Sequence, residues 1–195
     1  MIVTKSADEM RIMREAGRIT AAALRAVGEA VRPGVTTAEL DMLAESVIRE
    51  AGAVPAFKGY HGFPATLCTS VDGEVVHGIP GKRVLREGEI LSVDCGAIVD
   101  GYYGDSAMTF PVGEVSAVAR RLMGATREAL EAGIARCRPG MRLGDISAAV
   151  QAAAEGAGFS VVREYVGHGI GRSMHEDPQV PNYGRAGTGP TLKTG

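Results

Sequence analysis

The sequence contains no tryptophan, and aromatic residues make up only 5% of its 195 positions. So few aromatic side chains argue against a surface that stacks on nucleic-acid bases. The formal net charge is -2, so there is no excess of basic residues to bind nucleic acid or an anionic membrane. We therefore expect a protein that binds neither nucleic acid nor membranes.

Cysteine is also scarce: the chain has three, and they form no Cys-x-x-Cys pair. This odd number favours a reducing compartment over a disulfide framework. Residues 1–15 contain charged residues throughout and lack the apolar core of a signal peptide. The most apolar stretch, residues 19–31, is interrupted by Arg25 and Glu29, so it cannot span a membrane. These absences together predict a cytoplasmic protein.

Glycine, by contrast, is abundant, with 27 residues in a chain that is still 45% hydrophobic. This composition indicates tight turns and close backbone contacts rather than disorder. A chain of 195 residues is long enough to bury a substantial core. We expect residues 1–195 to form a single domain.

Two helices are expected at the start of the chain. Apolar residues recur at helical spacing over residues 8–31, and the Arg-Pro-Gly tripeptide at 32–34 ends this pattern. Thr36 and Thr37 can cap a second helix, which extends to Glu50 and is followed by Gly52 as its C-terminal glycine.

The same pattern returns 106 residues later. Residues 116–137 have helical spacing, Arg-Pro-Gly recurs at 138–140, and residues 145–155 form the next expected helix. Each helix pair is followed by a β-rich stretch with a His-Gly-apolar tripeptide, at His61 and at His168. The sequence therefore predicts a duplicated helix–helix–β unit.

We place the first repeat at about 7–111 and the second at about 116–195. The first repeat continues through a long series of strands after its helices, whereas few residues follow the second helix pair. We therefore expect the second repeat to be incomplete and the chain to be a truncated form of a longer protein.

Residues 90–110 have the composition of two β-strands joined by Asp100-Gly101, a dipeptide typical of two-residue hairpin turns. Such a turn places Val99 opposite Tyr102 and fixes the pairing of the whole hairpin. Side chains alternate between the two faces of a strand. One face of the first strand is apolar and is expected to lie in the core; it consists of Leu91, Val93, Cys95, Ala97 and Val99.

The other face carries two carboxylates. In this register Asp94 lies opposite Ala107 and Asp105 lies opposite Gly96, so the two aspartates are diagonal neighbours. Their Cα atoms are expected about 7–8 Å apart or less. The flanking residues are small, so we expect room around the two side chains.

Two adjacent carboxylates repel each other, which raises the pKa of one of them unless a cation lies between them. A pair of divalent Mn, Fe, Co or Zn ions would remove that repulsion. Two alternatives remain from spacing alone. Asp94 and Asp105 are then either solvated polar residues on an exposed face or an acid–base pair that works without metal.

The sequence has only four histidines. His61, His77 and His168 each precede glycine and an apolar residue, so the glycine can bend the backbone and present the imidazole at a strand end. His175 begins the segment His-Glu-Asp-Pro. A lone histidine is more often a surface or core residue, but together with the aspartates these four fit a metal site that needs imidazole.

Six segments of the sequence resemble the type I methionine aminopeptidases, and the match stays in register from about Ser6 to Gly195. Several long motifs in the same order make this resemblance specific. The segments are Tyr60–Pro64 (YHGFP), Glu74–Pro80 (EVVHGIP), Ser92–Ala97 (SVDCGA), Gly101–Ser106 (GYYGDS), Gly167–Gly171 (GHGIG) and His175–Gln179 (HEDPQ).

The resemblance implies an α/β (α+β) pita-bread fold with pseudo-twofold symmetry and an incomplete second half, in which residues 1–195 form one catalytic domain. It also implies two bound divalent metal ions, Co, Mn, Fe or Zn. By resemblance, Asp94 chelates one metal, Asp105 bridges both, and His168 is the imidazole ligand.

The same resemblance assigns residues to the substrate. His77 is similar to a histidine that contacts the substrate near the scissile bond. His175 is similar to one that hydrogen-bonds the scissile carbonyl and stabilises its tetrahedral form. Tyr60, Phe63 and Cys68 fall where the family builds its pocket for the methionine side chain.

The implied reaction is hydrolytic removal of the N-terminal methionine from peptides and nascent chains whose second residue is small. The expected partners are therefore peptide or nascent-chain N-termini and the ribosome, and the protein is expected to be a monomer.

One departure from the family pattern affects activity. The family uses two further glutamate ligands, which have no match in residues 1–195, so we expect the 195-residue chain to show little hydrolysis. Two alternative functions are a non-catalytic pita-bread binding module and a prolidase-like peptidase that cleaves X-Pro bonds.

Overall fold

The computed structural model describes residues 1–195, which form two compact units. The hairpin unit consists of Ala7–Ser116 and Ile170–Met174. The histidine unit consists of Met1–Ser6, Ala117–Gly169 and His175–Gly195. None of the four α-helices is both long and apolar enough to cross a membrane. That residues 1–195 act as one domain stays a prediction.

The hairpin unit begins with two helices, α1 (Ala7–Ala30) and α2 (Thr37–Glu50), close to the predicted bounds. Of the two predicted capping residues, Thr36 caps α2, whereas Thr37 is the first residue of the helix. The Thr36 hydroxyl accepts a hydrogen bond from the backbone N–H of Glu39, 3.2 Å away. The Glu39 carboxylate in turn accepts from the backbone N–H of Thr36 at 2.7 Å, which completes a capping box.

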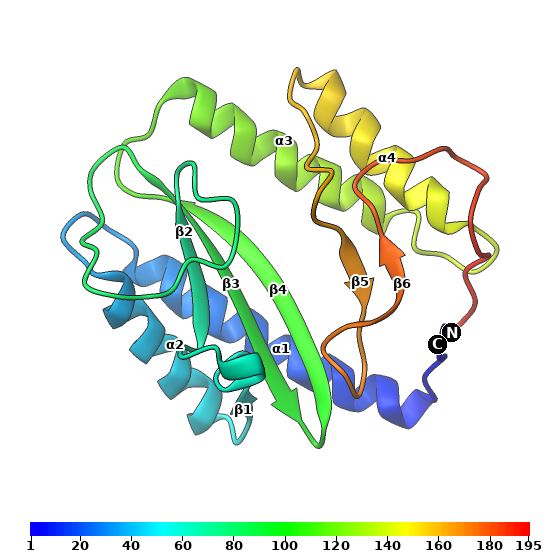
Figure 1. Cartoon of the computed structure of the whole chain (residues 1–195), viewed down its shortest axis with the longest axis horizontal. Helices are drawn as coiled ribbons and strands as arrows, with labels where there is room; N and C mark the ends of the chain where they lie inside the picture. Colours follow the sequence, from blue (N-terminus) through cyan, green and yellow to red (C-terminus); the bar gives the residue numbers. More distant parts are fainter. The chain divides into compact units, whose positions relative to one another are not determined.

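A four-stranded antiparallel sheet follows, consisting of β1 (Val54–Pro55), β2 (Leu67–Val71), β3 (Ile90–Val99) and β4 (Tyr102–Pro111). Strand β3 is central: β1 and β2 pair with one of its edges, and β4 pairs with the other. Helices α1 and α2 lie along one face of this sheet (Figure 1).

The face of β3 that meets the helices is the predicted apolar one. Leu91, Val93, Cys95 and Ala97 have no exposed surface, whereas Val99 at the strand end is partly exposed. They pack against buried side chains of both helices, which include Ile19, Leu24, Leu40 and Ile48. Burying each large aliphatic side chain contributes about 1.5–3 kcal/mol to folding, so the sheet and helices stabilise each other.

The histidine unit contains α3 (Ala117–Ile134), α4 (Leu143–Gly156), β5 (Gly167–Gly169) and β6 (Glu176–Val180). Helix α3 ends three residues before its predicted end at 137, and α4 begins two residues before its predicted start at 145. In Figure 1, α3 and α4 lie side by side, and the short antiparallel pair β5–β6 follows them.

The β-rich stretch expected between the second helix pair and His168 is wrong for residues 161–166, which form no strand. The side-chain amide of Asn182 donates to the carbonyls of Val162 and Tyr165, at 3.0 and 3.4 Å. Backbone carbonyls that are bound by a side chain do not need a neighbouring strand. The strand begins only at Gly167, where β6 provides a backbone partner.

Candidate active site

The hairpin formed by β3 and β4 has the predicted register. Asp94 pairs with Ala107, and Asp105 pairs with Gly96, so both carboxylates project from the face opposite the helices. The two turn residues have φ angles of 47° and 78°, the left-handed values that a type I′ turn requires. Local turn chemistry is therefore sufficient to bring the two aspartates together.

Asp94 is half-buried, and its carboxyl has an unusual proton affinity. Its pKa is raised from the ordinary 3.8 to about 7. Burial is the largest cause, and the charge and hydrogen bonding of the neighbouring Asp105 carboxyl contribute the rest of the increase. The backbone N–H of Cys95 acts in the opposite direction. Ionising both carboxyls together is therefore costly unless a cation lies beside them.

An apolar cluster lies next to this pair. Cys68 on β2 is directly opposite Asp94 on β3, so the two side chains share a face. Burial raises the pKa of the Cys68 thiol to about 12, and the charge of Asp94 adds to the effect, so the thiol stays protonated. The pocket cluster consists of Ala56, Phe57, Cys68 and Met174, with Tyr60, Phe63, Ile98 and Tyr103 packed around it.

Three of these residues, Tyr60, Phe63 and Cys68, are the ones that the sequence assigned to the methionine pocket, and the fold gathers them in one cluster. Ile98 and Tyr103 were not named, although they pair in the hairpin register on the aspartate face and could have been found from it.

Met174 and Phe57 were also missed. Met174 is 5% exposed. It is the one large apolar side chain in the polar segment before His175, and that contrast in the sequence could have indicated that it is buried. Phe57 has no such signal, because it follows a two-residue strand whose pairing with β3 is a tertiary contact.

The expectation of open room around the aspartates is wrong on one side. A Cβ atom added at Gly96 would lie 2.8 Å from the Cβ of Ala56 and 2.9 Å from the ring of Phe57. The pocket cluster therefore fills the space beside Gly96, and the glycine allows that close packing.

His77 lies in the exposed segment between β2 and β3, in the same unit as the aspartates. The next residue ties this segment to β2: the backbone N–H of Thr69 donates to the Gly78 carbonyl at 2.8 Å, and the Gly78 N–H donates to the Ser70 hydroxyl at 3.2 Å. His77 is thereby held near the edge of β2.

The predicted bend at the glycine after His61 occurs, with φ 82° at Gly62, but the backbone also bends at His61 and His77 themselves. His61 has φ 48° and His77 has φ 61°, both in the left-handed region that non-glycine residues seldom occupy. His61 belongs to the short 3₁₀ helix η1 (Tyr60–Gly62) rather than to a strand end, and its ring contacts the Tyr60 ring edge-on, with centroids 4.3 Å apart.

His168 and His175 lie together in the histidine unit, with ring centroids 4.4 Å apart. The Nδ1 atom of His168 is 3.0 Å from the carbonyl oxygen of Gly169. A hydrogen on Nδ1 that is donated to this carbonyl leaves the lone pair of the neutral ring on Nε2, the form that can ligate a metal.

The structure thus brings together Asp94 with Asp105, and His168 with His175, each pair within one unit. No group of three or more His, Cys, Asp or Glu side chains suited to a metal ion occurs in it. Carboxylate oxygen and imidazole nitrogen are nevertheless the donors that Mn, Fe, Co and Zn prefer, and the electrostatic conflict at Asp94 is the kind that a cation relieves.

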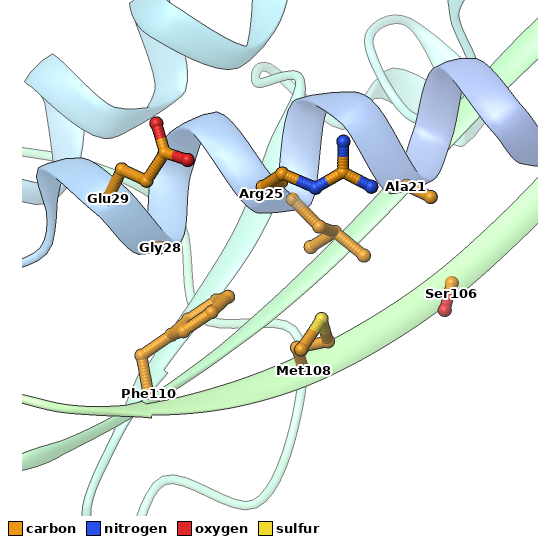
Figure 2. A pocket seen from close by; sticks show the side chains of 8 residues that line it. Ala21, Arg25, Gly28, Glu29, Ser106, Met108 and Phe110 are labelled. Atoms are coloured by element: carbon orange, nitrogen blue, oxygen red, sulfur yellow. The ribbon is translucent and has the colours of Figure 1, made fainter.

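A groove of about 440 Å³ lies on the other face of the hairpin, between α1 and β4. Figure 2 shows Met108 and Phe110 of β4 beneath Arg25 and Glu29 of α1. Its β4 residues alternate with Asp105 and so face away from the carboxylates. We therefore do not assign this groove to the candidate site.

The model of metallopeptidase family M24 matches residues 11–195. The methionine aminopeptidase of Clostridium acetobutylicum is 54% identical over 196 residues, a match that covers 100% of this chain and 78% of that protein. The crystal structure of methionine aminopeptidase from Thermotoga maritima superposes with a TM-score of 0.97 at 47% identity, covering 99% of this chain and 78% of that one. These similarities confirm the predicted pita-bread fold.

A more distant structure bears on the X-Pro alternative. Prolidase from Pyrococcus furiosus superposes with a TM-score of 0.83 at 22% identity, covering 98% of this chain and 54% of that one. This likeness shows a shared fold alone.

Proposed function

This chain belongs to metallopeptidase family M24, and from that membership we propose that it is a metal-dependent hydrolase that removes the N-terminal methionine from peptides and nascent chains. The observation that carries the proposal is the Asp94–Asp105 pair beside an apolar cluster. Carboxylates suit the metals of hydrolytic centres, and the cluster offers an apolar site for an unbranched side chain such as methionine. A small second residue in the substrate is part of the proposal.

Asp94, Asp105 and His168 are the proposed metal ligands. When bound, divalent ions would lower the pKa of water and polarise the scissile carbonyl. The raised pKa of Asp94 supports this assignment, because an adjacent cation would favour the ionised form of a carboxyl that burial and Asp105 now disfavour. We propose two such ions, Co, Mn, Fe or Zn.

His77 and His175 are the proposed catalytic residues that contact the substrate. His175 would donate a hydrogen bond to the scissile carbonyl as it gains negative charge. His77 would bind near the scissile bond. Tyr60, Phe63 and Cys68 would hold the methionine side chain, and the protonated thiol of Cys68 suits an apolar wall rather than a nucleophile.

The proposal is tested by assaying hydrolysis of Met-Ala, Met-Leu, Leu-Ala and Met-Pro peptides with added Mn or Co, beside the Clostridium acetobutylicum relative as a positive control. We expect cleavage only after methionine, strongest before alanine, and low turnover by the 195-residue chain. Calorimetry measures metal binding independently of turnover. Asp94→Asn and Asp105→Asn should each weaken metal binding about 10- to 100-fold or more.

Asp100→Asn is the matched control, because it makes the same chemical change at the turn of the same hairpin, away from the carboxylate pair. Asparagine also tolerates the left-handed backbone found there. Equal metal affinity in all three variants would contradict the proposed ligands.

The X-Pro peptidase and the non-catalytic binding module are tested by the same panel. Cleavage of X-Pro bonds in preference to Met-Ala would favour the first. A chain that binds no divalent metal would favour the second, although Asp94, Asp105 and His168 are present.

We further propose that residues 1–195 act as one catalytic domain in the cytoplasm, as a monomer that meets nascent chains near the ribosome. The three unpaired cysteines support a reducing compartment. Light scattering of the purified chain tests the monomer, and cosedimentation with ribosomes tests that partner.

A further inference from the structure

The histidine unit contains an ion pair that joins the N-terminal segment to the start of β6. The Lys5 ammonium lies 2.6 Å from the Glu176 carboxylate, and the two side chains are 12% and 19% exposed. The Lys58–Glu45 pair, by comparison, leaves its lysine 43% exposed. A pair so withdrawn from water is screened little by salt, and removal of one partner leaves the other charge poorly solvated.

Lys5 is itself held by backbone contacts. Its ammonium also donates to the Val3 carbonyl at 2.8 Å, and its backbone N–H donates to the Gly195 carbonyl at 2.7 Å. The Met1 amino group pairs with Asp177, one residue beyond Glu176. Figure 1 shows the two chain ends side by side at this point. The N-terminal segment therefore packs on the first residues of β6.

Glu176 is fixed from its other side by β5. Its backbone pairs with that of Gly169, where a bulge interrupts the strand pair. A Cβ atom at Gly169 would lie 2.2 Å from the Asp177 carbonyl oxygen, so only glycine permits this approach. The backbone of Glu176 thus pairs with β5, and its carboxylate forms an ion pair with Lys5.

His175 precedes Glu176 directly, so whatever fixes Glu176 also limits where the His175 ring can lie. That ring contacts the His168 ring with centroids 4.4 Å apart. The position of the His175 ring and its packing against His168 therefore both depend on how Glu176 is held.

We propose that Lys5 is a positioning residue for His175: its ion pair with Glu176 holds the start of β6 and thereby orients the His175 imidazole beside His168. The importance of this orientation for catalysis rests on the role of His175 under the proposed function. The positioning itself is a property of the fold and can be tested without turnover.

The test uses the scarcity of histidine. Four imidazoles give four sets of ring signals in the NMR spectrum of the 195-residue chain. At constant pH we expect cross-peaks between the His168 and His175 rings in the parent chain. Lys5→Met should weaken these cross-peaks at least about twofold and shift the His175 signals. Signals of His61 and His77, in the hairpin unit, should stay in place and report that the chain is folded.

Two further variants separate positioning from charge. The double variant Lys5→Met/Glu176→Met removes the pair without leaving a buried unpaired carboxylate, and we expect it to change the His175 signals as Lys5→Met does. Lys5→Arg keeps the charge and should restore the parent spectrum. Lys193→Met is the matched control: Lys193 is exposed in the same unit, so the spectrum should not change.

A kinetic readout links the position to the reaction. If the chain cleaves Met-Ala peptides, Lys5→Met and the double variant should lower kcat about 10- to 100-fold and change KM less than about threefold, because a displaced hydrogen-bond donor acts mainly in the transition state. An inactive parent chain would count against the proposed function alone. Unchanged ring cross-peaks in the double variant would overturn the positioning role.

Discussion

Two helix pairs in this molecule are built by the same local signals, yet they bury very different faces. Helices α2 and α4 are both 14 residues long and begin 106 residues apart. The turns that precede them contain glycines with nearly equal φ angles, 94° at Gly34 and 90° at Gly140. In both pairs an acidic side chain, Glu39 or Asp145, accepts a hydrogen bond from the backbone N–H at the start of the helix.

The turn between the two helices of each pair is also held alike. The Gly34 N–H donates to the Leu85 carbonyl at 2.9 Å, and the Gly140 N–H donates to the Leu192 carbonyl at 3.0 Å. In return, the backbone N–H of each leucine donates to the carbonyl of the residue after the glycine, Val35 at 2.8 Å and Met141 at 2.7 Å. The repeat predicted from the sequence therefore extends to individual backbone hydrogen bonds.

The difference lies in burial. In α1 and α2 the buried side chains include Ile19, Leu24, Leu40 and Ile48, each at most 2% exposed. In α3 and α4 the buried positions are small residues: Ala125, Ala129, Gly133, Gly144 and Ser147. Four of the large apolar side chains of α3 are exposed, namely Val118, Leu122, Leu130 and Ile134. Local signals thus define a helix pair, whereas a packed sheet supplies most of its stability.

The largest expected effect comes from core truncation at equivalent positions. Leu40 of α2 is 1% exposed, whereas Ile146, its equivalent in α4, is only partly buried. Leu40→Ala should lower the free energy of unfolding by about 3 kcal/mol, because it leaves a cavity in a close-packed core. Ile146→Ala should cost about 1 kcal/mol. Urea denaturation measures both, and equal losses would refute the contrast between the two pairs.

The second effect is a pH dependence of stability that is expected in the hairpin unit, because the adjacent carboxyls Asp94 and Asp105 belong to that unit. The folded-state pKa of Asp94 is raised to about 7 from 3.8, mainly by burial. The stability linked to this proton is complete below pH 3.8 and is lost as pH rises through 7. With a chelator present, Asp94→Asn should remove that loss. The full shift corresponds to about 4 kcal/mol at pH 8, and solvent screening of the part-exposed carboxyl reduces it to the order of 2 kcal/mol.

Unfolding curves at pH 4 and pH 8 check this result. Asp100→Asn, at the turn of the same hairpin, should leave the pH dependence of the parent unchanged. A parent chain that gains stability between those pH values relative to Asp94→Asn would show that the sign is wrong.

A third comparison concerns the caps. The hydroxyl of Thr36 accepts from the helix N-terminus, whereas the equivalent residue Arg142 has no acceptor atom and binds the Gly189 carbonyl at 2.8 Å instead. Thr36→Ala should cost about 1 kcal/mol of unfolding free energy. Arg142→Ala should cost less than about 0.5 kcal/mol. A larger loss at Arg142 would mean that its contact with Gly189 matters more than the cap.

The smallest effect is expected at the shared acidic position of the two caps. Hydrogen bonds from Thr36 lower the pKa of Glu39, and those from the backbone of Arg142 and Gly187 lower the pKa of Asp145. This stability is present above the ordinary values of 4.5 and 3.8 and is lost as pH falls through the folded pKa.

Glu39→Gln and Asp145→Asn should therefore each make helix content less sensitive to acid, by similar small amounts. Circular dichroism between pH 2 and pH 6, roughly the range over which carboxylates titrate, measures the change. A response in one variant alone would show that the two caps, although alike in geometry, are not equivalent in energy.

The hairpin shows why part of the candidate site could be predicted. Asp100-Gly101 dictates a turn, the turn dictates the register, and the register places Asp94 and Asp105 on one face. Every step is local in sequence, so no tertiary contact is needed. The cap at Thr36 is local in the same way. The repeat could also be predicted, because each of its two copies, 106 residues apart, is formed by signals between neighbouring residues.

The pocket cluster shows why the rest could not. Phe57 and Met174 are 117 positions apart in the sequence and carry no shared motif, yet both are buried with Cys68. The left-handed backbone at His61 and His77 is likewise set by the loops that surround these residues.

The sequence by itself therefore determined the duplicated helices, the cap of α2 and the carboxylate hairpin, since each depends on neighbours within a few residues. Only the tertiary structure decided which apolar side chains surround that hairpin, how far burial raises the pKa of Asp94, and that Lys5 pairs with Glu176. Packing, desolvation and long-range ion pairs depend on residues distant along the chain, and spacing within a motif does not encode them.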